Sequence, residues 1–184
     1  MIARLLAAFA FLFAMPASAQ PADPPAPSET LVVHAGRLIA DPGRAPSGPS
    51  TIVVVDGRIQ SVSDGLQPPP AGARLIDLSR LTVLPGLIDS HVHLGGNPGD
   101  QFWEEVVNPN EYSVVLGVQN ALRTVRAGFT TVRDLGSAGQ VGHMLRRGTA
   151  EGRFPGPRIL SSGPALSIIG GHGDVSGFRP EVVE

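Results

Sequence analysis

The 184-residue chain contains no cysteine and no lysine. Without cysteine, neither disulfide bonds nor thiolate metal sites are available. Without lysine, all 14 basic residues are arginine, so the chemistry of a lysine amino group is excluded within this sequence. The formal net charge of −2 gives no excess of positive charge, and we therefore expect no nucleic-acid partner.

An apolar run at the N-terminus is too short to cross a bilayer. Arg4 supplies a positive charge, residues 5–15 are apolar throughout, and Ala17-Ser18-Ala19 fits the small-residue cleavage pattern. A membrane-spanning helix needs about 20 apolar residues. We therefore predict a cleavable export signal over residues 1–19, with cleavage near Ala19. The mature protein is then periplasmic or secreted, with no stable membrane anchor. A buried N-terminal helix is the alternative interpretation.

Short β-type runs come after the leader. Residues 20–30 are rich in Pro and Ala and predict a flexible linker. Asp56-Gly57, between the apolar runs 51–55 and 58–62, is a strong signal for a two-residue hairpin. Residues 31–83 are predicted to form a small composite β-sandwich domain, with further strands over residues 31–39, 73–78 and 81–84.

From residue 84 the pattern changes to alternating strands and helices. This alternation favours parallel βα units, so the fold class is α/β. A complete (β/α)8 barrel takes about 250 residues, whereas only three strands are predicted here. Residues 84–184 are therefore expected to be the incomplete start of a TIM-like barrel, and the chain is interpreted as an N-terminal fragment. The predicted strands are 87–93, 130–135 and 158–162, and the predicted helices are 110–127 and 140–151.

Two histidines end the first strand of this second part. Residues i and i+2 of a strand point to the same face, so the imidazoles of His91 and His93 converge. Such a pair can bind one divalent metal ion at about 2.0–2.1 Å per nitrogen. Asp89 shares their parity and is expected to hold an imidazole in its ligating tautomer. Solvated histidines with no metal role are the simpler alternative.

Several blocks together resemble the amidohydrolase superfamily. The block at residues 84–93 resembles the first barrel strand with its metal-binding His-x-His, and residues 31–83 resemble the small domain that flanks the barrel. The subgroup resembled is the Xaa-Pro dipeptidase-like or imidazolonepropionase-like one, and the similarity covers roughly residues 31–180. The other blocks that carry it are residues 127–136, 156–163 and 170–174.

The resemblance implies a hydrolase of C–N bonds. One or two divalent ions, usually zinc, would activate a water that attacks an amide or similar carbonyl. The natural substrates would be dipeptides or N-acyl amino acids, with cyclic amides or imidazolones as the alternative. In dinuclear members a carboxylated lysine bridges the ions, and this chain has no lysine. Further histidines and the general acid/base Asp are expected beyond Glu184, so no catalytic residue is assigned within this chain.

The resemblance also assigns His172, in a glycine-rich segment after the third strand, to substrate binding. A histidine that caps its own turn is the alternative. Asp134 is interpreted as a strand-end hydrogen-bond or ion-pair residue, and His34 and His143 as surface or packing residues. We expect the fragment alone to be inactive. A truncated, non-catalytic metal- or ligand-binding module is the competing function. The sequence is compatible with a homo-oligomer.

Overall fold

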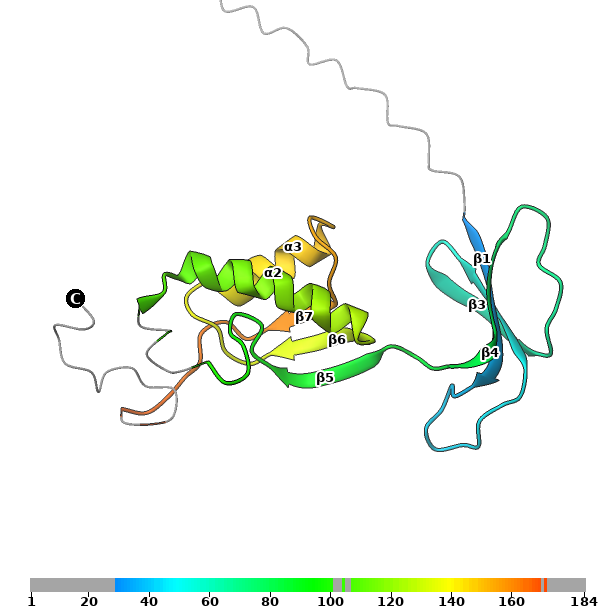
Figure 1. Cartoon of the computed structure of the whole chain (residues 1–184), viewed down its shortest axis with the longest axis horizontal. Helices are drawn as coiled ribbons and strands as arrows, with labels where there is room; N and C mark the ends of the chain where they lie inside the picture. The colour runs from blue at the N-terminus through cyan, green and yellow to red at the C-terminus, as the bar shows by residue number, and fades with distance from the viewer. Residues whose placement is uncertain (1–28, 101–103, 105–106, 170, 172–184) are drawn as a thin grey trace, which may run out of the picture. The chain divides into compact units, whose positions relative to one another are not determined.

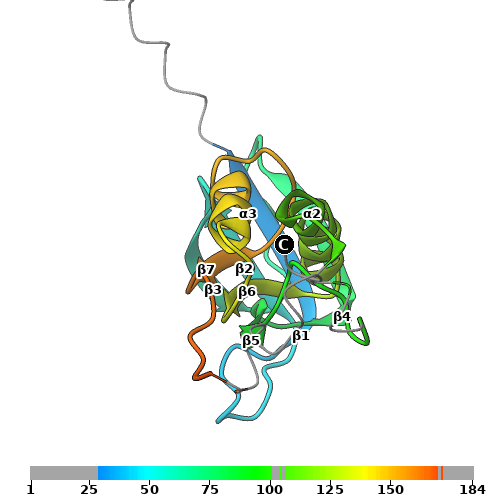
Figure 2. The same cartoon turned by 90° about the vertical axis from the view of Figure 1, so that its left-hand side faces the viewer.

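The structure is a computed structural model that describes residues 29–100, 104, 107–169 and 171. Close contacts divide the chain into two compact units. Of the described residues, the first unit holds 29–37 and 48–81, and the second holds 38–47 and those from 82 onward. Figures 1 and 2 together label the helices and strands of both units. Within the described residues, no helix is both long and apolar enough to cross a membrane.

The first unit is built on a four-stranded sheet with the order β3-β2-β1-β4. Strand β2 pairs antiparallel with both β1 and β3. Val32, Ala35 and Ile52 are buried and form its apolar interior. The strands are β1 (Thr30–Leu38), β2 (Ser50–Val55), β3 (Arg58–Asp64) and β4 (Arg74–Val83).

The hairpin between β2 and β3 is confirmed. Asp56 and Gly57 both have positive φ, at 49° and 74°, as a two-residue type I′ turn requires. Val55 lies opposite Arg58 directly across this turn. Asparagine, aspartate and glycine tolerate this conformation best, so the local sequence determines where the chain reverses.

Two details of this region differ from the expectation or extend beyond it. Residues 74–83 form one continuous strand, so the predicted break between residues 78 and 81 is wrong. Gly36 of β1 approaches the Ser79 carbonyl so closely that no side chain fits between them. The pairing of β4 with β1 keeps the polar residues Ser79 and Arg80 within the strand. The described residues of this unit form a single sheet, and the sandwich stays a prediction.

The second unit is α/β. Its three strands are all parallel, in the order β5-β6-β7. Both helices cover the same face of the sheet (Figures 1 and 2). The elements are β5 (Leu87–Val92), α2 (Asn110–Arg126), β6 (Phe129–Asp134), α3 (Val141–Ala150) and β7 (Arg158–Ser161).

The predicted alternation of strands and helices is confirmed to within a few residues at each boundary. Apolar residues three and four apart along α2 form its inner face, and Gly128, with φ 96°, ends the helical segment. Leu145 of α3 lies against Gly117 of α2, where a side chain would have no room. The buried core consists of Leu94, Val132, Val141, Leu145 and Ile159.

The opposite face of this sheet is not covered by the two helices. Ile159 points into the core with 4% of its surface exposed, whereas its neighbour Leu160 is 53% exposed. The prediction of an α/β unit with three parallel strands is therefore confirmed. The closed barrel stays a prediction, because the described residues of this unit form an open sheet of three strands.

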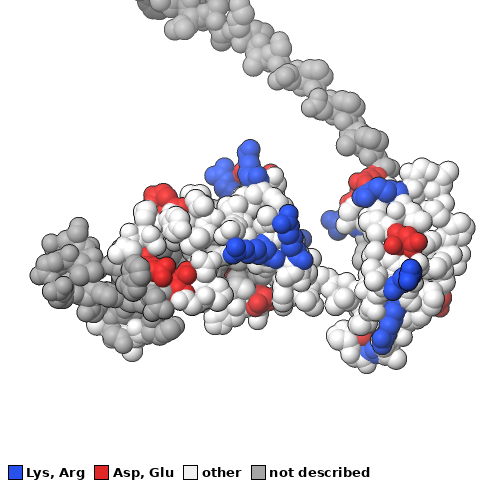
Figure 3. Space-filling model, viewed as in Figure 1, with Lys and Arg blue, Asp and Glu red and all other residues white. Residues whose placement is uncertain are grey.

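Charged side chains are scattered over both units. On the face seen in Figure 3, arginines and acidic residues occur in small groups on both units, with uncharged areas between the groups. Ion pairs such as that between Arg74 and Glu29, at 3.3 Å, are largely exposed to solvent. Exposed ion pairs contribute little to stability, so the folding of each unit depends chiefly on its apolar interior.

Candidate metal centre

His91 and His93 lie at the carboxyl end of β5, the first strand of the parallel sheet. His91 is the penultimate residue of the strand, and His93 comes directly after its last residue, Val92. Both histidines are exposed. Their Nε2 atoms are 3.3 Å apart, and the rings meet at an interplanar angle of 71°. The i, i+2 spacing thus brings two imidazole nitrogens together at one point.

The other ring nitrogen of His93 has a backbone partner. Nδ1 lies 2.9 Å from the carbonyl oxygen of Gly136, in the loop after β6. A carbonyl can only accept, so Nδ1 carries the proton and donates it. In the neutral ring this leaves the Nε2 lone pair free, which is the form that ligates a metal ion.

The separation of the two nitrogens fits a shared ion. Two nitrogens about 2.0–2.1 Å from one tetrahedral ion are roughly 3.3–3.4 Å apart. The observed 3.3 Å also allows His91 to donate a hydrogen bond to His93 when no ion is present. The donor set of two imidazoles suits zinc, and also iron, nickel or manganese.

Asp89 acts on the backbone of this strand. Its Oδ1 accepts a hydrogen bond of 3.0 Å from the His91 N–H. The ring hydrogen bond at this site is instead the one from His93 to the Gly136 carbonyl. The assignment of Asp89 to holding an imidazole therefore stays a prediction.

Asp134 is the last residue of β6, the strand beside β5. It is fully buried, while the preceding Arg133 is exposed, so the two side chains point to opposite faces. Asp134 Oδ2 accepts a hydrogen bond of 3.1 Å from the Leu94 N–H. The interpretation of Asp134 as a strand-end hydrogen-bond residue is confirmed.

Asn120, which was not predicted from the sequence, binds the segment after the histidines through hydrogen bonds. Its Nδ2 donates to the carbonyl oxygens of Leu94 and Gly96, at 3.0 and 2.8 Å. Asn120 comes three residues after the buried Gly117 and directly before the buried Ala121. Asparagine is unfavourable within a helix, so its place on the packed side was the available signal.

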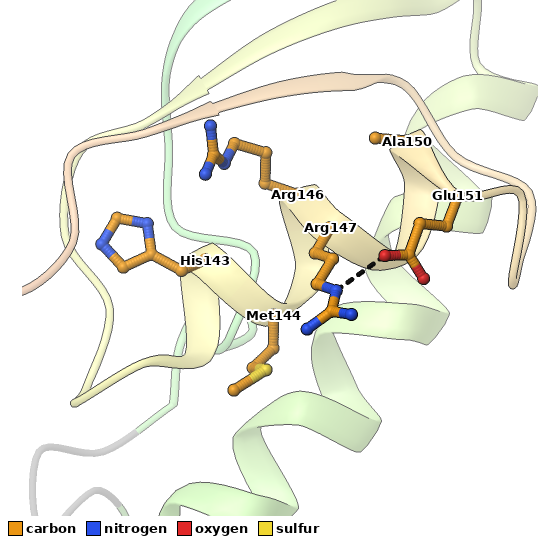
Figure 4. Close-up of a pocket in the computed structure, with 6 residues that line it drawn as sticks. All are labelled: His143, Met144, Arg146, Arg147, Ala150 and Glu151. Atoms are coloured by element: carbon orange, nitrogen blue, oxygen red, sulfur yellow. Dashed lines mark hydrogen bonds and ion pairs between the residues drawn. The ribbon is translucent and has the colours of Figure 1, made fainter. Parts of the chain in front are cut away.

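The remaining described histidines lie apart from this pair. His34 Nε2 lies 2.8 Å from the Gln67 carbonyl in the four-stranded sheet. His143 of α3 is half-buried and lines a shallow hollow along the outside of that helix (Figure 4). Arg147 and Glu151 also line the hollow and form an ion pair of 2.7 Å.

His172 lies outside the described residues, so its substrate-binding role stays a prediction. Within the described part of the chain, no group of three or more His, Cys, Asp or Glu side chains is placed to hold a metal ion. A catalytic zinc ion commonly has three protein ligands and a water. His91 and His93 are thus a partial ligand set.

Residues 82–182 match the model of the amidohydrolase family. The chain belongs to this family. The match begins just before β5 and includes both histidines, so the parallel unit is the part that defines membership.

Named relatives and solved structures agree with this membership. The chain is 31% identical over 161 residues to the ochratoxinase of Aspergillus niger, covering 80% of this chain and 31% of that protein. It is 33% identical over 105 residues to a dihydroorotase of Anaeromyxobacter sp. (strain K), covering 57% and 21%. A crystal structure of a Xaa-Pro dipeptidase with bound methionine superposes with a TM-score of 0.74 at 32% identity, covering 83% of this chain and 38% of that one. The chain thus spans between about a fifth and two fifths of the length of these proteins.

Proposed function

We propose that the protein carrying this chain is a metal-dependent amidohydrolase that cleaves C–N bonds of peptide-like substrates. In this proposal His91 and His93 hold one divalent ion, with zinc as the first candidate. The observation that carries it is the 3.3 Å separation of the two Nε2 atoms at the end of β5. Membership of the amidohydrolase family supports the reaction class.

The residues present fit such an ion. A divalent metal lowers the pKa of a bound water to about 7 and so supplies a nucleophile at neutral pH. His93 offers Nε2 because its Nδ1–H is donated to the Gly136 carbonyl. His91 is placed by its backbone, which the Asp89 carboxylate holds through the N–H. The chain's own contribution is therefore to bring two imidazoles together at one point, with the Nδ1–H of His93 bound by a backbone carbonyl.

Other parts of the proposed machinery lie outside the described residues. A third ligand and a general acid/base carboxylate are expected from segments other than those described. His172 is proposed to hydrogen-bond the substrate carbonyl or carboxylate. Residues 1–19 are proposed to direct export to the periplasm or medium, where a hydrolase of small peptides or N-acyl amino acids would act on scavenged material.

Two relatives favour different substrates. The Xaa-Pro dipeptidase structure supports dipeptides as the first candidate. The dihydroorotase relatives favour the second, a cyclic amide. A non-catalytic metal-binding module remains the competing function, and it differs from both in predicting no turnover.

The deciding experiment is hydrolysis by the full-length gene product before and after removal of metal. Purified protein is assayed on a panel of Xaa-Pro dipeptides, N-acyl amino acids and cyclic amides. We expect turnover of at least one class, its loss after treatment with a chelator, and its return when zinc is added back. Turnover that survives complete removal of metal would refute metal dependence. Absence of turnover in the metal-loaded protein on every class would favour the binding module.

A further inference from the structure

A buried carboxylate stands beside the candidate metal centre without belonging to it. Asp134 has 0% of its surface exposed. Burial of a carboxylate is costly unless hydrogen bonds compensate it. The four ion pairs found among the described residues all involve other acids, so arginine does not explain its burial. Its hydrogen-bond donors must therefore account for an acid at this position.

Two of the three hydrogen-bond donors to Asp134 are connected to His93. Asp134 Oδ2 accepts from the N–H of Leu94, the residue directly after His93. Asp134 Oδ1 accepts from the N–H of Gly136 at 3.3 Å. Gly136 is also the residue whose carbonyl accepts the proton on His93 Nδ1. One carboxylate thus binds the peptide next to the histidine and the residue that holds its ring.

His93 needs such support because it lies beyond the strand. Strand β5 ends at Val92, whose partner in β6 is Asp134 itself, and the ladder stops there. The carbonyl that sets the tautomer of His93 belongs to Gly136, in the loop after β6. Backbone hydrogen bonds from Leu135 to Val92 and from Ser137 to Gly163 hold the neighbours of Gly136, whereas the N–H of Gly136 itself is bound by Asp134. The partner of the second ring nitrogen determines which nitrogen is free to bind a metal ion.

We propose that Asp134 is a positioning residue that acts through Leu94 and Gly136. It keeps the His93 ring protonated on Nδ1, with Nε2 directed toward His91. The inference rests on the proposed function in that the ring so held is a metal ligand. It adds a buried acid, 41 positions from the histidine it serves, to the residues on which the site depends.

Ser137 provides a matched control on the same carboxylate. Its Oγ–H donates to Asp134 Oδ1 at 3.3 Å, and the same Ser137 oxygen accepts from the N–H of Gly142 in the first turn of α3. This contact leads away from His93 toward the helix. Ser137→Ala removes one donor while leaving both contacts that flank the histidine in place.

The test compares Asp134→Asn with Ser137→Ala in the full-length gene product. Leu94 and Gly136 donate to different oxygens of Asp134, and asparagine replaces one of these oxygens with an NH2 donor, so one of the two contacts is lost. Zinc affinity is measured by competition with a chelator, and the protonated nitrogen of the His93 ring is identified by ¹⁵N NMR in the metal-free protein. We expect Asp134→Asn to weaken zinc binding by roughly 10–100-fold, as for other partners of metal ligands. We also expect it to mix the two tautomers of His93, and Ser137→Ala to do neither.

Each outcome has a definite meaning. Unchanged zinc affinity in a folded Asp134→Asn variant, with only its melting temperature lowered, would overturn the inference and make Asp134 purely structural. If Asp134→Asn does not fold, the tautomer in the unaltered protein decides: protonation on Nδ1 supports the inference and protonation on Nε2 overturns it. Failure of the unaltered protein to bind zinc would refute the proposed function instead, and the metal-free NMR comparison would still judge Asp134.

Discussion

The four-stranded sheet and the parallel unit differ in how far apart their paired strands lie in the sequence. In the four-stranded sheet the β2–β3 pairing is local, because a turn at Asp56-Gly57 joins neighbouring segments. In the parallel unit every strand pairing requires a helical crossover, and β5 meets β6 only after more than 30 intervening residues. The hairpin therefore joins residues that are already close in the sequence. The helical crossovers instead bring loops that are distant in the sequence to the carboxyl edge of the parallel sheet.

The histidines of the two units illustrate this difference. His34 and His93 each have one ring nitrogen near a backbone carbonyl, at 2.8 and 2.9 Å. His34 has no other histidine in its sheet, since none occurs between residues 35 and 90. His93 has His91 at 3.3 Å. A carbonyl partner alone therefore does not make a ligand, and the converging second imidazole is the distinguishing feature.

The largest stability effect is expected in the parallel unit, from Gly117→Val. A side chain at this position meets Leu145 of α3, so the two helices must separate or shift. Overpacking of this kind costs about 1–3 kcal/mol. Urea unfolding of the full-length gene product would measure it. Val115→Ala, on the exposed side of the same helix, is the control and should be nearly neutral. Equal losses for both variants would contradict the close packing of α2 on α3.

A smaller effect is expected in the four-stranded sheet from Gly57→Ala. The residue has φ 74°, a conformation that costs an L-amino acid roughly 1–2 kcal/mol. Gly48→Ala is the control, because Gly48 has ordinary φ and open space around it. Both variants should keep the zinc affinity of the unaltered protein. A loss of zinc binding in Gly57→Ala would contradict the claim that the four-stranded sheet takes no part in the metal centre.

The smallest effect concerns pH and the end of α3. The pKa of Glu151 lies below its ordinary value, chiefly because Arg147 and then Arg153 donate hydrogen bonds to its carboxylate. A lowered pKa in the folded state stabilises the protein above the ordinary pKa of glutamate, about 4.3, and this contribution disappears as the pH falls through the lowered value. Glu151→Gln should therefore lower the melting temperature slightly at pH 7 and not at pH 2. An equal difference at both pH values would contradict the ion pairs.

Most elements could be predicted from the sequence because their signals are local. The hairpin residues, the apolar period of α2 and the short apolar runs of β5–β7 each identify an element without knowledge of its neighbours. The predicted break within β4 is wrong because Ser79 and Arg80 look like the end of a strand. They continue the strand because β4 pairs with β1, where Gly36, more than 40 residues away, lies against the Ser79 carbonyl.

The candidate site was predictable only in part for the same reason. The spacing of His91 and His93 shows that they share a face, and this needs no tertiary information. The Gly136 carbonyl, the Asp134 carboxylate and the Asn120 amide reach the histidine segment only through the packing of β6 and α2 beside β5. Asp134 could be recognised as a strand-end acid, while its two contacts on either side of His93 depend on the register.

Zinc titration of the metal-free, full-length gene product tests the central claim most directly, with His93→Asn compared against His34→Asn. Both substitutions remove an imidazole that contacts a backbone carbonyl, but only one removes a partner of His91. We predict that His34→Asn keeps the affinity of the unaltered protein. His93→Asn should lose more than the roughly 10–100-fold that removal of a ligand's hydrogen-bond partner costs. Equal zinc affinity in His93→Asn and the unaltered protein would contradict the metal centre at the end of β5.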